Sequence, residues 1–294
     1  MAERLPEGCV TSVRPPHPGG RRLELHAHTH FSDGQLSPEA LVALAIEREV
    51  AALAVTDHDS VEGIAPAVAA AGSQLEIVPG IEISSALEGH DLHILGYFFD
   101  PTSVRLRERL ERFREERRQR AIAILERLAE LGMPVSADEV FAAAGPGVVG
   151  RPHVAHALLR AGHVTTMEQA FQKYLGMRGE AFVPRPEFAS ADAVRIIREA
   201  GGVAVLAHPG ILTHRIVEQL RDAGLGGVEV WHPQHGMAAQ RRWYETAKAL
   251  GLVPTGGSDF HGPHRGAGLG DMPVPERTLD DLRARALGST QRSP

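Results

Sequence analysis

The feature that most constrains this chain is a short apolar run that ends in closely spaced histidines, residues 23–34 (LELHAHTHFSDG). Side chains alternate between the two faces of a strand, so His26 and His28 point the same way and can share one metal ion. His30 would join them if the strand continued, but the Ser-Asp-Gly sequence at 32–34 is typical of a turn. A single His-x-His pair also occurs at solvated strand ends, so the metal hypothesis depends on further clusters.

Composition limits the kind of metal site that this chain can build. Cys9 is the single cysteine, so there is no intramolecular disulfide and no thiolate cage. Any metal must therefore be held by imidazole and carboxylate groups. Sixteen histidines stand against three tyrosines and two tryptophans, a bias that favours such a site.

The overall composition is that of a globular protein. The 294 residues are 43% hydrophobic and 23% charged, and the length suits one α/β barrel. The net charge of −6 argues against a protein that coats nucleic acid through bulk charge, although a local basic groove stays open. No apolar stretch approaches the ~20 residues of a membrane span. Residues 1–22, with four prolines and no apolar run, are not a secretory signal, and we expect a mobile N-terminal tail on a cytoplasmic protein.

Strand and helix patterns alternate in both outer parts of the chain. The first strand is followed by a helix that Ser37 caps, with Pro38 in its first turn, and that ends near Arg48. The later expected elements are strands at 52–56, 75–79, 91–98, 203–207, 227–231 and 252–255 and helices at 63–71, 190–200 and 237–250. This alternation predicts an α/β protein with a mainly parallel sheet whose functional groups gather at the carboxyl edge.

The alternation stops at about residue 101. Residues 103–131 have the pattern of one long helix, with an apolar stripe at Leu106, Leu110, Phe113, Ile124, Leu128 and Leu131. Shorter helices are expected at 137–144, 152–161 and 167–175. We therefore expect a helical insertion at 102–185 that divides a barrel formed by 23–101 and 186–294.

Candidate metal ligands stand at the ends of five separate strands. They are His26 and His28, His58, His93, His208, and Asp259 with His261. Glu82 and Asp33 are expected in the adjoining turns. One histidine at a strand end is usually a hydrogen-bonded core residue, but the same placement on five strands favours a metal site.

These residues stand in a recognisable series. It comprises His26-x-His28, Asp33, Thr56-Asp57-His58-Asp59, Pro79-Gly80-x-Glu82, His93-x-Leu95-Gly96, Ala207-His208-Pro209 and Gly257-Ser258-Asp259-x-His261. In order, spacing and residue type the series resembles the PHP family, named for polymerase and histidinol phosphatase. The helical insertion, with Gly-Arg-Pro-His at 150–153, resembles the branch of 3′,5′-nucleotide bisphosphatases and 5′→3′ exoribonucleases.

The resemblance implies a distorted (β/α)7 barrel and a trinuclear metal centre. Carried over position by position, nine residues would hold the three ions: His26, His28, Glu82 and Asp259 the first; Glu82, His93 and His208 the second; Asp33, His58 and His261 the third. Several relatives have a histidine at the place of Asp33. Because all nine positions are occupied, the resemblance argues against the degenerate, non-catalytic PHP domains attached to some DNA polymerases.

The residue types favour phosphate ester chemistry. Three carboxylates against three divalent ions leave the site about three charges positive, which suits a phosphate dianion. A metal-bound hydroxide would be the nucleophile, so no serine nucleophile is needed, and we interpret Ser258 as a turn residue. We expect Asp57 and Asp59 to orient imidazole or anchor the turn. Ligation without sulfur suits Mn²⁺, which we favour, or Fe²⁺ or Zn²⁺.

Residues that contact substrate are harder to predict. Arg151 precedes a proline-started helix and could grip a phosphate bidentately, the alternative being a surface arginine. His153 could bind phosphate or protonate the leaving oxygen. His235 and Arg265 lie in loops at the carboxyl edge. Residues 105–120 hold eight arginines against four acidic residues, a pattern more typical of a solvated helix face than of a nucleic-acid track.

We therefore expect a metal-dependent phosphoesterase that acts on a nucleotide phosphate: a 3′,5′-bisphosphate, a mononucleotide or the 5′ end of a short RNA. Two alternatives stay open. One is a phosphatase of a small metabolite such as histidinol phosphate, and the other is an idle metal-binding module. The insertion argues against the first, and the full ligand set and the chain length argue against the second. We expect a small-molecule partner, no membrane and no obligate protein partner.

Overall fold

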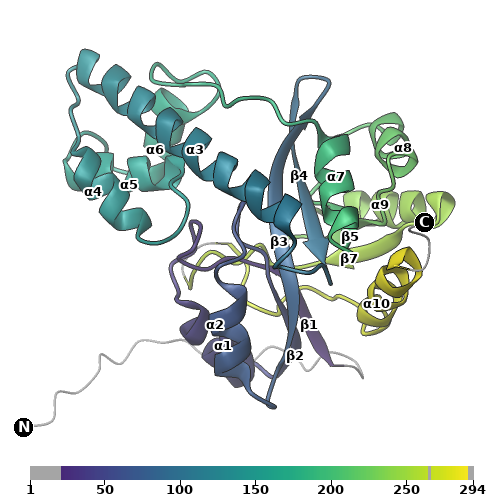
Figure 1. Ribbon diagram of the computed structural model, residues 1–294. Coiled ribbons are helices and arrows are strands. Elements are labelled where there is room, and N and C mark those ends of the chain that lie inside the picture. Colours follow the sequence, from purple (N-terminus) through teal and green to yellow (C-terminus); the bar gives the residue numbers. More distant parts are fainter. Residues whose placement is uncertain (1–20, 264–265, 291–294) are drawn as a thin grey trace, which may run out of the picture.

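The computed structural model describes residues 21–263 and 266–290, and its centre is a sheet of seven strands that follow one another in chain order (Figure 1). The strands are β1 (Arg22–Ala27), β2 (Val50–Val55), β3 (Glu76–Leu87), β4 (His90–Tyr97), β5 (Val203–Leu206), β6 (Gly227–Trp231) and β7 (Val253–Gly256). Four neighbouring pairs are parallel, as predicted, but β4 is antiparallel to both β3 and β5. Only Glu88 and Gly89 separate β3 from β4, both at positive φ, and so short a turn permits only an antiparallel return.

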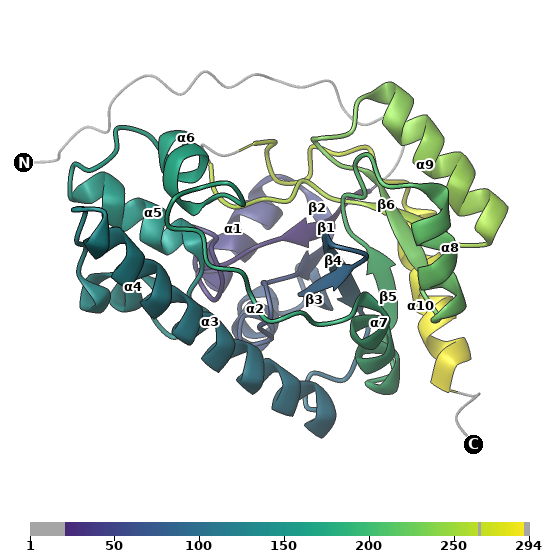
Figure 2. The same cartoon turned by 90° about the horizontal axis from the view of Figure 1, so that it is seen from above.

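The sheet curves until its first and last strands meet, and the segment after β7 closes it (Figure 2). Phe260 bridges in parallel to Ala27, and its carbonyl accepts the N–H of His28 at 2.9 Å. The buried Glu24 carboxylate strengthens this seam because it accepts the N–H groups of Ser258 at 2.9 Å and Gly270 at 2.7 Å. The fold is therefore α/β, a distorted seven-stranded barrel, as expected.

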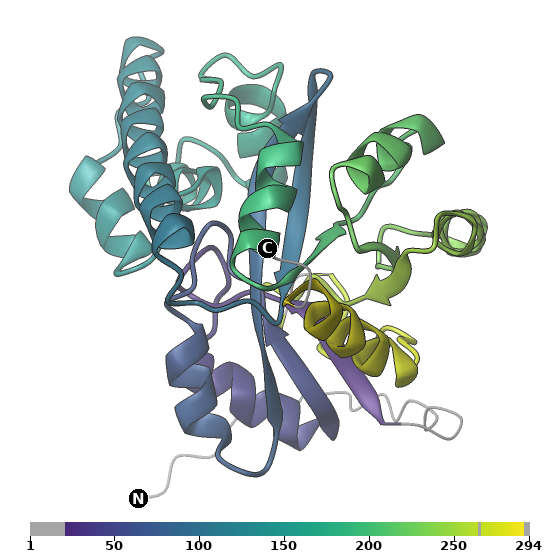
Figure 3. The ribbon, with the colours of Figure 1, turned by 45° about the vertical axis from the view of Figure 1, so that its right-hand side comes forward.

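Helices cover the outside of the barrel (Figure 3). They are α1 (Pro38–Glu47), α2 (Ile64–Ala71), α7 (Ser190–Glu199), α8 (His214–Asp222), α9 (Met237–Leu250) and α10 (Arg277–Thr290). Ser37 accepts the N–H of Ala40 at 3.2 Å, which confirms the predicted cap of α1. Helices α8 and α10 were not predicted from the sequence. Both bury an apolar stripe, for example Leu279 and Leu282 of α10.

A group of helices lies between β4 and β5 in the chain, and Figure 1 shows it beside the barrel. It comprises α3 (Val104–Glu130), α4 (Ala137–Ala144), α5 (Arg151–Arg160), α6 (Met167–Ala170) and the π-helix η1 (Phe171–Leu175). The first half of α3 packs through Leu106 and Leu110 into the barrel core, whereas Ile124 and Leu128 belong to a separate apolar cluster within these helices. This second cluster supports our proposal of an insertion at 102–185. Leu131, expected in the stripe, is exposed.

Two expectations from the sequence concern the N-terminal tail and membrane-spanning helices. Residues 1–20, most of the expected N-terminal tail, lie outside the described residues. Among the residues that the structure describes, no helix is long and apolar enough to cross a membrane.

Candidate metal centre

The end of β1 presents the first two histidines as its alternation requires. Leu23 and Leu25 point into an apolar cluster, whereas His26 and His28 are fully buried on the other side, with ring centroids 5.2 Å apart. Their Nε2 atoms lie 3.3 and 3.1 Å from Oδ1 of Asp259, which comes from the segment that closes the barrel. The predicted sharing of one site by this pair is therefore sterically feasible.

Glu82 is the centre of the cluster. It lies inside β3 rather than in a turn, so that part of the prediction was wrong, and its side chain is fully buried. Five imidazoles surround its carboxylate, those of His26, His28, His58, His93 and His208, each with a nitrogen 2.8–3.3 Å from a Glu82 oxygen. His93 reaches it from the first half of β4, because the antiparallel strand starts near the edge where its neighbours end.

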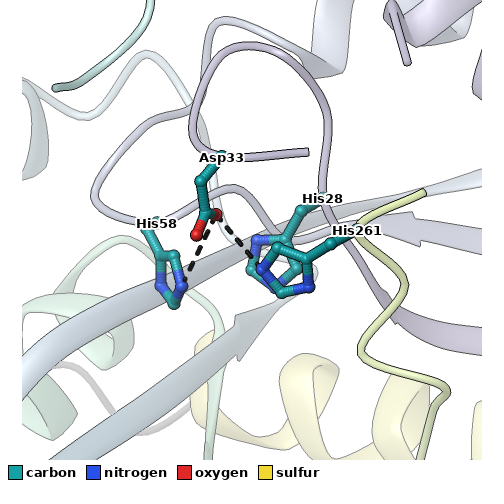
Figure 4. Close-up of side chains that lie close together, drawn as sticks. All are labelled: His28, Asp33, His58 and His261. Atoms are coloured by element: carbon teal, nitrogen blue, oxygen red, sulfur yellow. Dashed lines mark ion pairs between the residues drawn. The ribbon is translucent and has the colours of Figure 1, made fainter. Parts of the chain in front are cut away.

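A second group lies on the other side of His28. Figure 4 shows Asp33 between His58 and His261, with Oδ1 of Asp33 3.8 Å from Nε2 of His58 and 3.2 Å from Nε2 of His261. The rings of His28 and His261 stack with centroids 4.2 Å apart. Asp33 lies in the turn after β1, as predicted, and the turn brings it back over the barrel's edge.

The donor set can be tested for its fit to metal ions. Among the described residues, buried atoms without a hydrogen-bond partner include Nε2 of His26 and His28, Nδ1 of His58 and Oε2 of Glu82. Burial removes such polar atoms from water without giving them a hydrogen-bond partner, and a cation bound among them would supply the missing favourable interaction. One set of ligand atoms within 4.8 Å of one another comprises His26, His28, Glu82 and Asp259; a second comprises His28, Asp33, His58 and His261; a third comprises His58, Glu82 and His93. Imidazole and carboxylate donors at this spacing fit divalent transition metals.

In two of the rings the protein holds the other nitrogen, which fixes the tautomer. Nδ1 of His26 lies 3.0 Å from Oε1 of Glu229, and Nδ1 of His261 donates to the carbonyl of Asp259 at 2.8 Å. In both rings Nε2 is therefore the nitrogen left for a metal. Glu229 was not predicted from the sequence; the available signal was a glutamate within the apolar strand GVEVW.

His232 was also missed as a member of the cluster. It follows β6 directly, is buried, and places Nε2 3.4 Å from Oδ2 of Asp259. With His26 and Glu229 it forms a further group of potential ligands.

A cavity of about 170 Å³ opens beside the cluster. Its lining includes Asp33, His58 and His93 and also four arginines, Arg117, Arg120, Arg151 and Arg185. Potential metal ligands and guanidinium groups thus share one cavity, an arrangement that suits an anionic substrate.

Comparisons with known proteins are consistent with this geometry. A family model described as the PHP domain matches residues 24–181. The chain belongs to the PHP family. This PHP protein is 36% identical over 249 residues to the 5′-3′ exoribonuclease Rnm of Escherichia coli (strain K12), with 82% of this chain and 85% of that relative covered. It is 34% identical over 252 residues to a 3′,5′-nucleoside bisphosphate phosphatase of Chromobacterium violaceum, with 83% of this chain and 88% of that relative covered.

A solved structure extends the PHP comparison to the whole fold. A Bifidobacterium adolescentis protein, assigned as a metal-dependent phosphoesterase, superposes with a TM-score of 0.85 at 30% identity, over 91% of this chain and 97% of that one. The expected family and distorted-barrel fold are therefore confirmed. The chain is a metal-dependent phosphoric ester hydrolase.

Charges within the PHP site are strongly coupled. Burial acts to raise the pKa of Glu82, but the imidazoles of His58 and His93 outweigh it and hold the pKa well below its usual range. Burial likewise acts to lower the pKa of His28, whereas its contacts with Asp259 and Glu82 raise it to about 10. The buried carboxylates therefore attract positive charge, which protonated imidazoles or bound cations can supply.

The predicted substrate residues have different environments. Arg151 lines the cavity. His153, the candidate acid, is buried with Nδ1 accepting the N–H of Gly150 at 3.0 Å, and burial lowers its pKa. His235 donates from Nδ1 to the carbonyl of Val230 at 2.9 Å. Neither histidine is among the described residues that line the cavity.

Arg265 lies outside the described residues.

The flanking polar residues have structural contacts of the expected kind. Asp57 accepts the backbone N–H and the hydroxyl of Thr29, both at 2.7 Å, and so anchors the turn after β1. Asp59 accepts the N–H of Ser84 at 2.8 Å. Ser258 donates its hydroxyl to Glu24, which agrees with a turn residue rather than a nucleophile.

Proposed function

We propose that this PHP protein hydrolyses a phosphate ester of a nucleotide, either a 3′,5′-bisphosphate or a mononucleotide, with the 5′ end of short RNA as a further substrate. The observation that carries the proposal is the shared cavity, in which potential metal ligands face arginines. The names of the two relatives, an exoribonuclease and a nucleoside bisphosphate phosphatase, support the same substrate class.

The nine predicted ligands would hold up to three divalent ions, with Mn²⁺ favoured over Fe²⁺ and Zn²⁺. Glu82 is suited to bridge two of them because its two oxygens face different imidazoles, Oε1 those of His93 and His208 and Oε2 those of His26, His28 and His58. Divalent ions bound there would activate water as hydroxide and neutralise the phosphate charge.

The chain's own groups would orient the metal ligands and the substrate phosphate. Glu229 and the carbonyl of Asp259 hold the rings of His26 and His261 with Nε2 directed inward. Arg151 would bind phosphate oxygens from the cavity wall, since its Nη1 donates to the carbonyl of Leu175 and leaves its other N–H groups for an anion.

A long RNA track along α3 receives less support than a small substrate. Four of the eight arginines at 105–120 pair with carboxylates: Arg105 with Glu199, Arg109 with Glu116, Arg114 with Glu62 and Arg117 with Asp59. Arginines that are already paired have little charge left for a phosphate backbone.

A phosphate-release screen with Mn²⁺ tests the proposal. The substrates are nucleoside mono- and bisphosphates, short 5′-phosphorylated RNAs and histidinol phosphate. We expect the highest kcat/KM on a nucleotide. A preference for histidinol phosphate would instead support the small-metabolite alternative, and no turnover of any substrate by the Mn²⁺-loaded protein would support the idle module.

A further inference from the structure

His232 is buried directly after β6, and its hydrogen lies on a different ring nitrogen from that of two neighbouring histidines. Nδ1 of His232 accepts the backbone N–H of Gln234 at 3.2 Å. A backbone N–H can only donate, so this nitrogen carries a lone pair, and in the neutral ring the hydrogen lies on Nε2. His26 and His261 have the opposite tautomer, with a lone pair on Nε2. His232 is therefore a hydrogen-bond donor toward the cluster.

This tautomer argues against His232 as a metal ligand. His26, Glu229 and His232 lie close enough together to hold a cation. An ion there would need a lone pair on Nε2 of His232, because Gln234 occupies Nδ1. Moving the hydrogen to Nδ1 would set two donors against each other inside the protein, which is unfavourable.

The hydrogen on Nε2 of His232 has an acceptor within reach. Nε2 lies 3.4 Å from Oδ2 of Asp259, and among the described residues no hydrogen bond of standard geometry satisfies it elsewhere. A buried N–H without an acceptor costs free energy, which favours a hydrogen bond in this direction.

The two oxygens of Asp259 face different groups. Oδ1 lies 3.3 Å from Nε2 of His26 and 3.1 Å from Nε2 of His28, the side on which a shared ion would bind, whereas Oδ2 faces His232. The χ2 torsion of aspartate is broad, so a carboxylate without an anchor can rotate and present either oxygen. The Asp259 side chain is 23% exposed, so burial alone does not fix its orientation.

We propose that His232 is a positioning residue that holds Oδ2 of Asp259 and so directs Oδ1 at the ion shared with His26 and His28. The inference rests on the proposed metal ligation by Asp259 and does not depend on the identity of the substrate. Groups that hold a metal ligand in place typically contribute about 10- to 100-fold to metal affinity, and we expect an effect of this size.

Two amide substitutions separate the tasks of the two ring nitrogens. In His232→Asn the side-chain oxygen can still accept the N–H of Gln234, but the side chain is too short to reach Asp259. In His232→Gln an amide N–H reaches the position of Nε2, but the acceptor for Gln234 is lost. Equilibrium dialysis against buffered Mn²⁺ should show a Kd about 10- to 100-fold higher in His232→Asn and closer to the wild-type value in His232→Gln. The number of ions bound at saturation should be the same in both variants.

A double-mutant cycle tests whether His232 acts through Asp259. In the Asp259→Ala background, His232→Asn should change the Kd for Mn²⁺ by less than about twofold, because the group that it positions is gone. The visible absorption spectrum of the Co²⁺-loaded protein is a second readout, since it reports ligand geometry. It should change in His232→Asn and keep the wild-type form in His232→Gln.

His214→Gln is the control, because His214 is an exposed histidine at the start of α8, and its Kd and spectrum should equal those of the wild type. Circular dichroism and thermal unfolding check that each variant is folded.

The results distinguish this inference from the proposed function. The expected order of Kd values would support the positioning role even if a phosphate-release screen found no activity. Unchanged Kd and spectrum in folded His232→Asn, with Mn²⁺ bound normally, would overturn this inference alone. The reverse order, with His232→Gln the weaker binder, would reduce His232 to a turn residue. Loss of one ion at saturation in both variants would make His232 a ligand. A wild-type protein that binds no Mn²⁺ would overturn both proposals.

Discussion

Replacing Glu229 by glutamine tests how the protein orients its metal ligands. Glu229 is fully buried, and its two oxygens have separate tasks: Oε1 lies 3.0 Å from Nδ1 of His26, and Oε2 accepts the backbone N–H of His208 at 2.8 Å. The carboxylate thus aligns two potential ligands at once. Glutamine keeps the shape but removes the charge that makes Nε2 of His26 a stronger donor.

The expected effect is on metal affinity rather than on the number of sites. Loss of a carboxylate behind a ligating histidine typically weakens metal binding by about 10- to 100-fold, or about 1.4–2.8 kcal/mol. We therefore expect the Kd for Mn²⁺ to rise by this factor in Glu229→Gln, while the number of ions bound at saturation stays the same. Equilibrium dialysis against buffered Mn²⁺, followed by elemental analysis, measures both quantities.

Two controls make the result interpretable. Glu245→Gln changes an exposed glutamate on α9 and should leave the Kd unchanged. Thermal unfolding of metal-free Glu229→Gln checks that the barrel is intact. An unchanged Kd would refute the orienting role. A loss of one ion at saturation would show that Glu229 is itself a ligand, in the group with His26 and His232.

Three further predictions follow from contacts elsewhere. Asp259→Asn should lower turnover by several orders of magnitude and reduce the number of Mn²⁺ ions bound per chain from the expected maximum of three. Asparagine tolerates the backbone φ of 50° at this position. Full activity of the variant would contradict the ligand set. Arg117→Ala leaves the buried carboxylate of Asp59 without its ion pair and should lower the free energy of unfolding by about 3 kcal/mol, measured by urea denaturation. An unchanged denaturation midpoint would contradict this prediction. Ser37→Ala removes the cap of α1 and should cost about 1 kcal/mol, lowering Tm by about 2–4 °C, and no shift would contradict the cap's contribution.

Local patterns predicted the elements that depend on neighbouring residues. The cap at Ser37 and the bounds of α3 agree with the structure to within a residue, because capping and helical periodicity act over a few positions. The amphipathic helices α8 and α10 had equally local signals and were overlooked. The reversal of β4 depended on the hairpin turn at Glu88 and Gly89, which the sequence analysis did not identify.

The sequence by itself determined the chemistry of the centre, because spacing and residue type along single strands limit the donors to imidazole and carboxylate. The tertiary structure decided which atoms meet. Glu229 lies 203 positions from His26, and Asp59 lies 58 positions before Arg117, so neither contact has a local signal. The choice of hydrogen-bond partner for each of the four cavity arginines arises in the same way. It depends on carboxylates and carbonyls that only the packing of the α3–η1 helices against the barrel brings within reach.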